Sequence, residues 1–142
     1  MEYQDVIPVK VAANLVAKIT YQYKGIILVY FINFITTDHF SAGLIIGGVD
    51  EEGPQVYSVQ SGAVIRQKIT SSGSGSFFIA GFMDANYSTT FNKQMGVEFV
   101  KTAISLAINR DNSSGGGVRI VDITKEGFSR IEYSFNELSH QN

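Results

Sequence analysis

The chain has 142 residues, 44% of them hydrophobic and 17% charged, so it can bury the core of one globular domain. Its net charge of −2 at pH 7, with lysines and arginines scattered singly, argues against binding to nucleic acid or to an anionic membrane. Cysteine is absent, which excludes disulfides and thiolate chemistry. The acidic stretch Met1–Asp5 is not the basic start of a secretory signal peptide.

A first helix is predicted over residues 8–23. Pro8 suits the first position of a helix, where its missing N–H is not needed. Apolar residues then recur every three or four positions, which predicts one buried stripe. The stripe comprises Ala12, Leu15, Val16, Ile19 and Tyr23.

The next stretch, residues 25–37, is apolar and uncharged, with neither helical nor alternating periodicity. It is shorter than the roughly 20 residues of a membrane span. By itself it could form a buried strand, and if exposed it has the composition of an aggregation-prone segment.

Residues 42–50 are predicted to form a central strand, with glycines where another element packs closely. The polar turn 50–54 leads to an alternating strand over 55–59, so a hairpin is expected, and another short strand follows over 63–69. A Gly/Ser loop at 70–76 precedes the apolar run 77–82, which we interpret as strand-like.

A second helix is predicted from its N-cap, Asn92, to about residue 110. Its wide apolar face predicts packing on both a sheet and a neighbouring helix. Residues 118–123 and 128–133 are expected to form a hairpin, and the tail 139–142 to fray. Helices in blocks beside antiparallel hairpins predict an α+β layered sandwich.

The helix exit Arg110–Gly117 combines Asp111 and two serines with three consecutive glycines. Such a turn can be a simple glycine-capped helix end, or a functional loop on a rigid scaffold. Ser74, in the Gly/Ser loop, could converge with Asp111 and Ser114. One carboxylate and two hydroxyls would form the supporting half of a site whose nucleophile lies elsewhere.

Other chemistries find little support. The only histidines are His39 and His140, so we expect no metal site, and no cofactor either. A serine–histidine–aspartate triad lacks its nucleophile elbow, because a strand-like run follows Gly73–Ser76 where a helix should begin. Neither glycine-rich loop matches a phosphate-binding motif, so a small-molecule binder is the least favoured alternative.

Five segments occur in the order and at the spacing of the second half of a proteasome beta subunit. They are Ser41–Gly48, Gln55–Val59, Gly73–Ser76, Gly81–Asp84 and Arg110–Gly117. The chain resembles this family over about residues 3–138, and within it most closely the caspase-like subunit, beta type-6. The resemblance implies an N-terminal nucleophile hydrolase fold, a four-layer sandwich of helices flanking two antiparallel sheets, of which residues 1–142 form the C-terminal portion.

In that family the mature N-terminal threonine attacks the peptide bond, and its own α-amino group manages the proton with the help of an early lysine and aspartate. The family's supporting residues fall on Ser74, Asp111 and Ser114. The resemblance further implies polypeptide substrates cleaved after acidic residues, other alpha and beta subunits as partners in stacked seven-membered rings, and a location in the cytoplasm and nucleus.

The chain departs from the family's pattern in two places. It contains no Gly-Thr-Thr processing site, so we expect this polypeptide alone to be inactive. Removing residues 25–37 restores the family's spacing, so we interpret them as an insertion and hypothesise a translated intron or a gene-model error as their origin. A mature transcript that encodes all thirteen residues would contradict that origin. The alternative function is a non-catalytic structural or assembly subunit of the beta ring.

Overall fold

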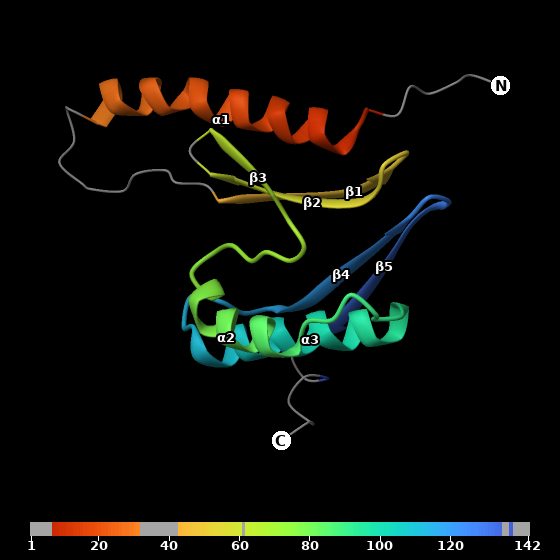
Figure 1. Ribbon diagram of the computed structural model, residues 1–142. Helices are drawn as coiled ribbons and strands as arrows, with labels where there is room; N and C mark the ends of the chain where they lie inside the picture. The colour runs from red at the N-terminus through yellow and green to blue at the C-terminus, as the bar shows by residue number, and fades with distance from the viewer. Residues whose placement is uncertain (1–6, 32–42, 61, 135–136, 138–142) are drawn as a thin grey trace. The chain divides into compact units, whose positions relative to one another are not determined.

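The computed structural model describes residues 7–31, 43–60, 62–134 and 137, with only the backbone described for 22–31. Two compact units, residues 1–70 and 71–142, divide the chain. The first holds α1 (Val9–Phe31), β1 (Leu44–Asp50), β2 (Gly53–Gln60) and β3 (Ala63–Gln67) (Figure 1). The second holds α2 (Ser76–Asn86), α3 (Lys93–Arg110), β4 (Gly117–Thr124) and β5 (Gly127–Ser134). Both units combine helices with antiparallel strands, which confirms the α+β prediction.

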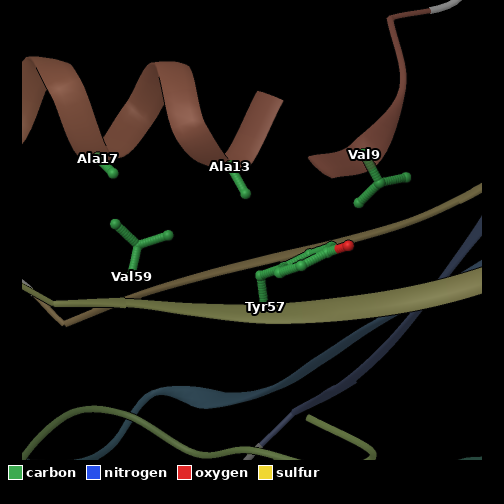
Figure 2. Close-up of a cluster of buried hydrophobic side chains, with 5 residues drawn as sticks. All are labelled: Val9, Ala13, Ala17, Tyr57 and Val59. Atoms are coloured by element: carbon green, nitrogen blue, oxygen red, sulfur yellow. The ribbon is translucent and has the colours of Figure 1, made fainter. Parts of the chain in front are cut away.

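Helix α1 packs on the sheet of the first unit through small side chains. Val9, Ala13 and Ala17 point toward Tyr57 and Val59 on β2 (Figure 2), and Ala13 and Val59 are 0% and 1% exposed. Alanines four residues apart lie on one face of a helix, and their short side chains let the helix backbone approach the sheet closely. Burial of this face is the main apolar contact of the first unit.

The predicted stripe of α1 is confirmed in part, because Val16 packs partly buried against the core, but it was wrong for Leu15 and Ile19. Leu15 and Ile19 are 54% and 45% exposed, whereas the buried residues are Val9, Ala13 and Ala17. Apolar residues occur on nearly every side of this helix, so their spacing does not single out one face. The ring of Tyr57 occupies the space under the helix, so the smallest side chains face the sheet.

The first helix is also longer than predicted. It continues through Gly25 to Phe31, so the first part of the apolar insertion is helical and not a strand. The remaining insertion residues, 32–37, lie outside the described residues, as do both histidines and the tail 139–142. In the described ranges, no helix has both the length and the apolar composition of a membrane span.

The three strands of the first unit form an antiparallel sheet in the order β1-β2-β3. The predicted hairpin is confirmed, with Asp50 opposite Gly53 across the turn. Among the described strands, however, β1 lies at the edge and β2 in the centre, contrary to the prediction for residues 42–50. Gly48 provides the expected close approach, because a Cβ there would lie 2.8 Å from Cγ2 of Val9.

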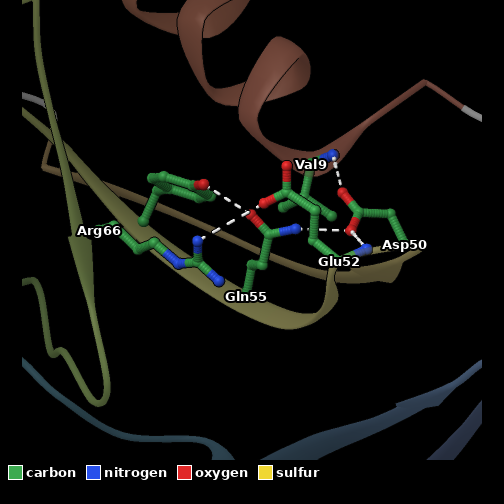
Figure 3. A network of polar contacts seen from close by, with 6 residues as sticks. Val9, Asp50, Glu52, Gln55 and Arg66 are labelled. Carbon is green, nitrogen blue, oxygen red and sulfur yellow. Dashed lines mark hydrogen bonds and ion pairs between the residues drawn. The ribbon is translucent and has the colours of Figure 1, made fainter.

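The start of α1 is held by a carboxylate 41 residues further along the chain (Figure 3). Asp50 accepts hydrogen bonds from the Val9 amide at 3.0 Å, the Glu52 amide at 2.9 Å and Gln55 Nε2 at 2.6 Å. Gln55 Oε1 accepts in turn from the buried Tyr57 hydroxyl at 2.6 Å. A carboxylate at a helix N-terminus satisfies an unpaired amide and interacts favourably with the helix dipole. Asp50 thus ties the helix to the β1–β2 turn.

Replacing Asp50 with asparagine is expected to destabilise the chain at neutral pH. The hydrogen bond from the Val9 amide is the largest cause that holds the pKa of Asp50 below 3.8. A depressed pKa means that ionised Asp50 stabilises the fold above pH 3.8, and that this contribution is lost as pH falls through the native value. Urea unfolding should therefore separate wild type from Asp50→Asn at neutral pH and bring them together in acid. Glu51→Gln, in the same turn, is the control, and an equal separation at both pH values would contradict the prediction.

The second unit contains a helix that sequence reasoning missed. The run interpreted as strand-like, residues 77–82, lies within α2. The Ser76 hydroxyl donates to the Gly73 carbonyl at 2.7 Å, and the Ser76 amide donates to the same carbonyl at 3.1 Å. A short apolar run cannot be assigned to strand or helix by periodicity alone. A helix does begin at Ser76, so the expected lack of a helix no longer argues against a nucleophile elbow. The preceding strand of such an elbow is still missing, because β3 ends at Gln67 and no strand leads directly into this turn.

Helix α3 is confirmed together with its cap, because Asn92 Oδ1 accepts from the Met95 amide at 2.9 Å. It packs against α2 and β4, as its wide apolar face predicted. Phe99 of α3 lies 5.5 Å from Phe82 of α2 and 5.4 Å from Phe91, centroid to centroid. Such aromatic pairs stabilise by about 0.5–1.5 kcal/mol each beyond their buried area, so they hold α2 firmly on α3.

The predicted hairpin of β4 and β5 is also confirmed, with Thr124 opposite Gly127 at the turn. Val118 and Ile120 are its buried residues, at 1% and 6% exposure. Lys101 of α3 is buried too, and its ammonium lies 4.7 Å from the centroid of the Tyr133 ring on β5. Strand β4 follows directly on the helix exit, so the hairpin and α3 together fix the loop between Asp111 and Gly117.

Candidate functional site

The structure brings Ser74, Asp111 and Ser114 together within the second unit. Oδ2 of Asp111 accepts a hydrogen bond from Ser74 Oγ at 2.6 Å and another from Ser114 Oγ at 2.6 Å. Ser74 lies 37 residues before Asp111, in the loop that leads into α2. The two hydroxyl-rich loops therefore converge on one carboxylate oxygen, as the sequence suggested.

Asp111 is the C-cap of α3 and is held there by its own backbone. Its amide donates to the Ala107 carbonyl at 2.8 Å, and its carbonyl accepts from the Ser114 amide at 3.0 Å. The second carboxylate oxygen, Oδ1, accepts from the Ser113 amide at 3.2 Å. A side chain that bonds the backbone two residues further on is a common turn element. Helix exit and turn together leave Asp111 9% exposed.

These donors keep Asp111 ionised. The Ser114 hydroxyl is the largest cause that holds the pKa of Asp111 below 3.8, followed by the Ser74 hydroxyl and the Ser113 amide, against a smaller opposing effect of burial. Hydrogen bonds to the charged form of a carboxyl group favour that form. The site therefore carries a negative charge at neutral pH.

The direction of these hydrogen bonds decides what the site can bind. A serine hydroxyl has one hydrogen, and both hydroxyls here point theirs at Asp111. Each serine oxygen consequently presents only lone pairs to any further partner. Ser74 is exposed and Ser114 is half-buried, so both remain accessible. An accepting, negatively charged cluster suits a donor such as an ammonium group.

The cluster by itself has no nucleophile with an adjacent base. None of the contacts described above brings a histidine or lysine to it, and the serine hydroxyls donate to a carboxylate whose pKa is low. Nor do the described residues contain a group of three histidine, cysteine, aspartate or glutamate side chains that could hold a metal ion.

Sequence reasoning missed one part of the site. Gly75 is buried against the cluster, and a Cβ there would lie 3.0 Å from Ser114 Oγ and 3.5 Å from Asp111 Oδ2. The signal was present in the Gly-Ser-Gly pattern around Ser74, but no role was assigned to its second glycine, Gly75.

Comparison with known proteins places the chain in a family. The profile described as Proteasome subunit matches residues 1–123. The chain belongs to the proteasome subunit family. It is 40% identical over 124 residues to a probable proteasome subunit beta type-1 of Schizosaccharomyces pombe. The aligned region covers 86% of this chain and 49% of that protein. It is also 40% identical over 128 residues to proteasome subunit beta type-9 of Mus musculus bactrianus, covering 89% and 52%.

A third relative, a proteasome subunit beta type-6-A like protein of Salmo salar, is 37% identical over 125 residues, covering 87% of this chain and 52% of that protein. These relatives are beta subunits of different types, so the findings establish a proteasome beta subunit but not the beta type-6 assignment. The helices and two antiparallel sheets agree with the α+β fold of N-terminal nucleophile hydrolases. The chain spans about half the length of the curated relatives it matches.

Proposed function

We propose that this chain supplies the supporting half of the threonine-type endopeptidase site of a proteasome core-particle beta subunit. One observation carries the proposal, namely that two serine hydroxyls donate to the same oxygen of ionised Asp111. The accepting oxygens of Ser74 and Ser114 would hold the α-ammonium group of an N-terminal threonine. The resemblance to the family supports this role for the three residues.

The chemistry follows from that placement. When the threonine hydroxyl attacks a peptide carbonyl, its proton passes to the threonine's own α-amino group. The amino group becomes an ammonium, and the negative cluster stabilises it while the carbonyl oxygen develops charge elsewhere. Residues 1–142 contain no Gly-Thr-Thr, so the nucleophile would come from a segment outside them. We expect the 142-residue polypeptide by itself to show no turnover.

The proposal extends to specificity, assembly and location. The subunit would cleave after acidic residues, within a particle of stacked alpha and beta rings in the cytoplasm and nucleus. The resemblance of residues 55–59 and 111–117 to the caspase-like beta subunit supports the acidic preference. Membership in the proteasome family supports assembly with other subunits.

A chimeric particle tests the proposal. The half of the Schizosaccharomyces pombe beta type-1 relative that this chain does not match is joined to residues 1–142, and particles are purified from cells that lack the native subunit. Fluorogenic peptides with acidic, basic or apolar P1 residues are then assayed. We expect turnover of the acidic peptide by the chimera and none by the 142-residue chain. Turnover by the isolated chain would contradict the proposed division of the site.

A second candidate function is that of a non-catalytic structural subunit of the ring. Large apolar side chains at the surface of the chain favour it, since Phe77 and Phe128 are 86% and 67% exposed. Exposed apolar residues of this size mark interaction surfaces. A chimera that enters assembled particles and adds no turnover toward any of the three peptides would support this function over the catalytic one.

A further inference from the structure

The two glycines that flank Ser74 serve different physical purposes. Gly73 has a φ of +93°, a conformation that favours glycine, and a Cβ there would meet nothing within 4 Å. Gly75 has a φ of −71° and a ψ of −14°, which any residue can adopt. The backbone conformation therefore does not require a glycine at 75.

Lack of space, and not the backbone, is what disfavours a side chain at position 75. A Cβ on Gly75 would lie 3.0 Å from the Cβ of Ala107 and 3.0 Å from Ser114 Oγ. Carbon atoms in ordinary contact are about 3.5–4.0 Å apart. The Gly75 backbone thus lies close to Ala107 in the last turn of α3, with little room for a side chain between them.

Ala107 is also connected to the cluster through the backbone. The Ala107 carbonyl accepts the amide hydrogen of Asp111 at 2.8 Å. The position of Ala107 therefore fixes where the Asp111 backbone, and with it the carboxylate, leaves the helix. Gly75 directly follows Ser74, whose hydroxyl must reach Asp111 Oδ2. One packing contact therefore relates the backbone that carries Ser74 to the backbone that carries Asp111.

We propose that Gly75 and Ala107 are positioning residues: the close contact between the Gly75 backbone and the Ala107 methyl group sets the distance at which Ser74 donates to Asp111. As a contribution to catalysis this inference rests on the proposed function, but the geometry it concerns is present in the chain alone. Any larger side chain at either position moves the loop outward. The Ser74 hydroxyl then loses its partner and turns its hydrogen toward the space meant for the ammonium.

The test uses the 142-residue chain and the carboxyl carbon resonance of Asp111 in a pH titration. Gly75→Ala is expected to raise the pKa of Asp111 toward 3.8, because the Ser74 and Ser114 hydrogen bonds both lower it in the wild type. Gly81→Ala is the matched control, since a Cβ at Gly81 in α2 meets nothing within 4 Å and should leave that pKa unchanged. Retention of the fold is checked by the amide resonances of β4 and β5.

A second substitution tests the pair itself. Gly75→Ala combined with Ala107→Gly removes one of the two 3.0 Å contacts and should move the pKa of Asp111 back toward its wild-type value. Ala107→Val enlarges the contact from the other side and should raise that pKa even if Gly75→Ala prevents folding. An unchanged pKa in a folded Gly75→Ala chain would overturn the proposal. A rise that Ala107→Gly fails to reverse would overturn the role of Ala107.

In the chimeric particle, Gly75→Ala should lower kcat by about 10²-fold with little change in KM, as expected for a misplaced group. An inactive chimera would contradict the proposed function and leave the Asp111 titration to decide the positioning role. An active chimera in which Gly75→Ala has no effect on kcat would overturn the link between this contact and catalysis.

Discussion

Asp111→Asn is expected to lower the kcat/KM of the chimeric particle by about 10³-fold or more. When residues act as a unit in catalysis, the loss of one removes nearly all of the rate enhancement that the unit supplies. The asparagine keeps the shape of the side chain but has no negative charge. Its one oxygen cannot replace both carboxylate oxygens, so its NH2 group faces either the two serine hydroxyls or the Ser113 amide. The first orientation reverses the hydroxyl hydrogens toward the ammonium, and the second removes the hydrogen bond that holds the turn at Ser113.

The acidic P1 peptide used for the chimera measures this loss. Asp84→Asn is the matched control, because Asp84 is an exposed aspartate of α2 in the same unit. We expect its kcat/KM to equal that of the unmodified chimera. Undiminished activity in Asp111→Asn would rule out the ammonium-holding role of the cluster, whereas equal losses in both variants would indicate a general defect of folding or assembly.

The largest expected effect on stability comes from Ala13→Leu. Ala13 is 0% exposed and faces Tyr57 and Val59 at the contact between α1 and its sheet. Three additional carbon atoms cannot be accommodated there without moving the helix or forcing side chains off their rotamers. Overpacking of this kind costs about 1–3 kcal/mol, so the free energy of unfolding should fall by about that amount.

Urea denaturation of the full chain checks this value, with Leu15→Ala as the control on the same helix. Leu15 is 54% exposed, and its truncation should change the free energy of unfolding by no more than about 0.5 kcal/mol. The opposite ranking of the two variants would show that α1 faces the sheet with the stripe predicted from its sequence and not with Val9, Ala13 and Ala17.

The candidate site was the part of the molecule that local sequence described best. A carboxylate at a helix exit, a hydroxyl three residues later and glycines after it form a turn whose bonds are mostly local, so Asp111 and Ser114 could be paired from their spacing. The convergence of Ser74 was proposed from composition and from family resemblance, and the 2.6 Å hydrogen bond confirms it. Its catalytic role remains a proposal.

The failures have a common cause. Residues 77–82 are apolar on every side, and so is much of α1, so neither segment carries the periodicity that distinguishes a strand from a helix or one helical face from another. Packing made both choices. Aromatic contacts with Phe99 hold α2 as a helix on α3, and the Tyr57 ring selects the alanine face of α1.

By itself the sequence determined the elements with clear local signals: the α3 cap at Asn92, the two hairpins, the α+β class and the polar turn at Asp111. Each depends on residues that are close in the chain. The tertiary structure alone decided the buried face of α1, its cap by Asp50, and the Gly75–Ala107 contact. Those features join segments that are far apart in the chain, 41 residues in the case of Val9 and Asp50. They depend on the space left between packed elements, which no local pattern encodes.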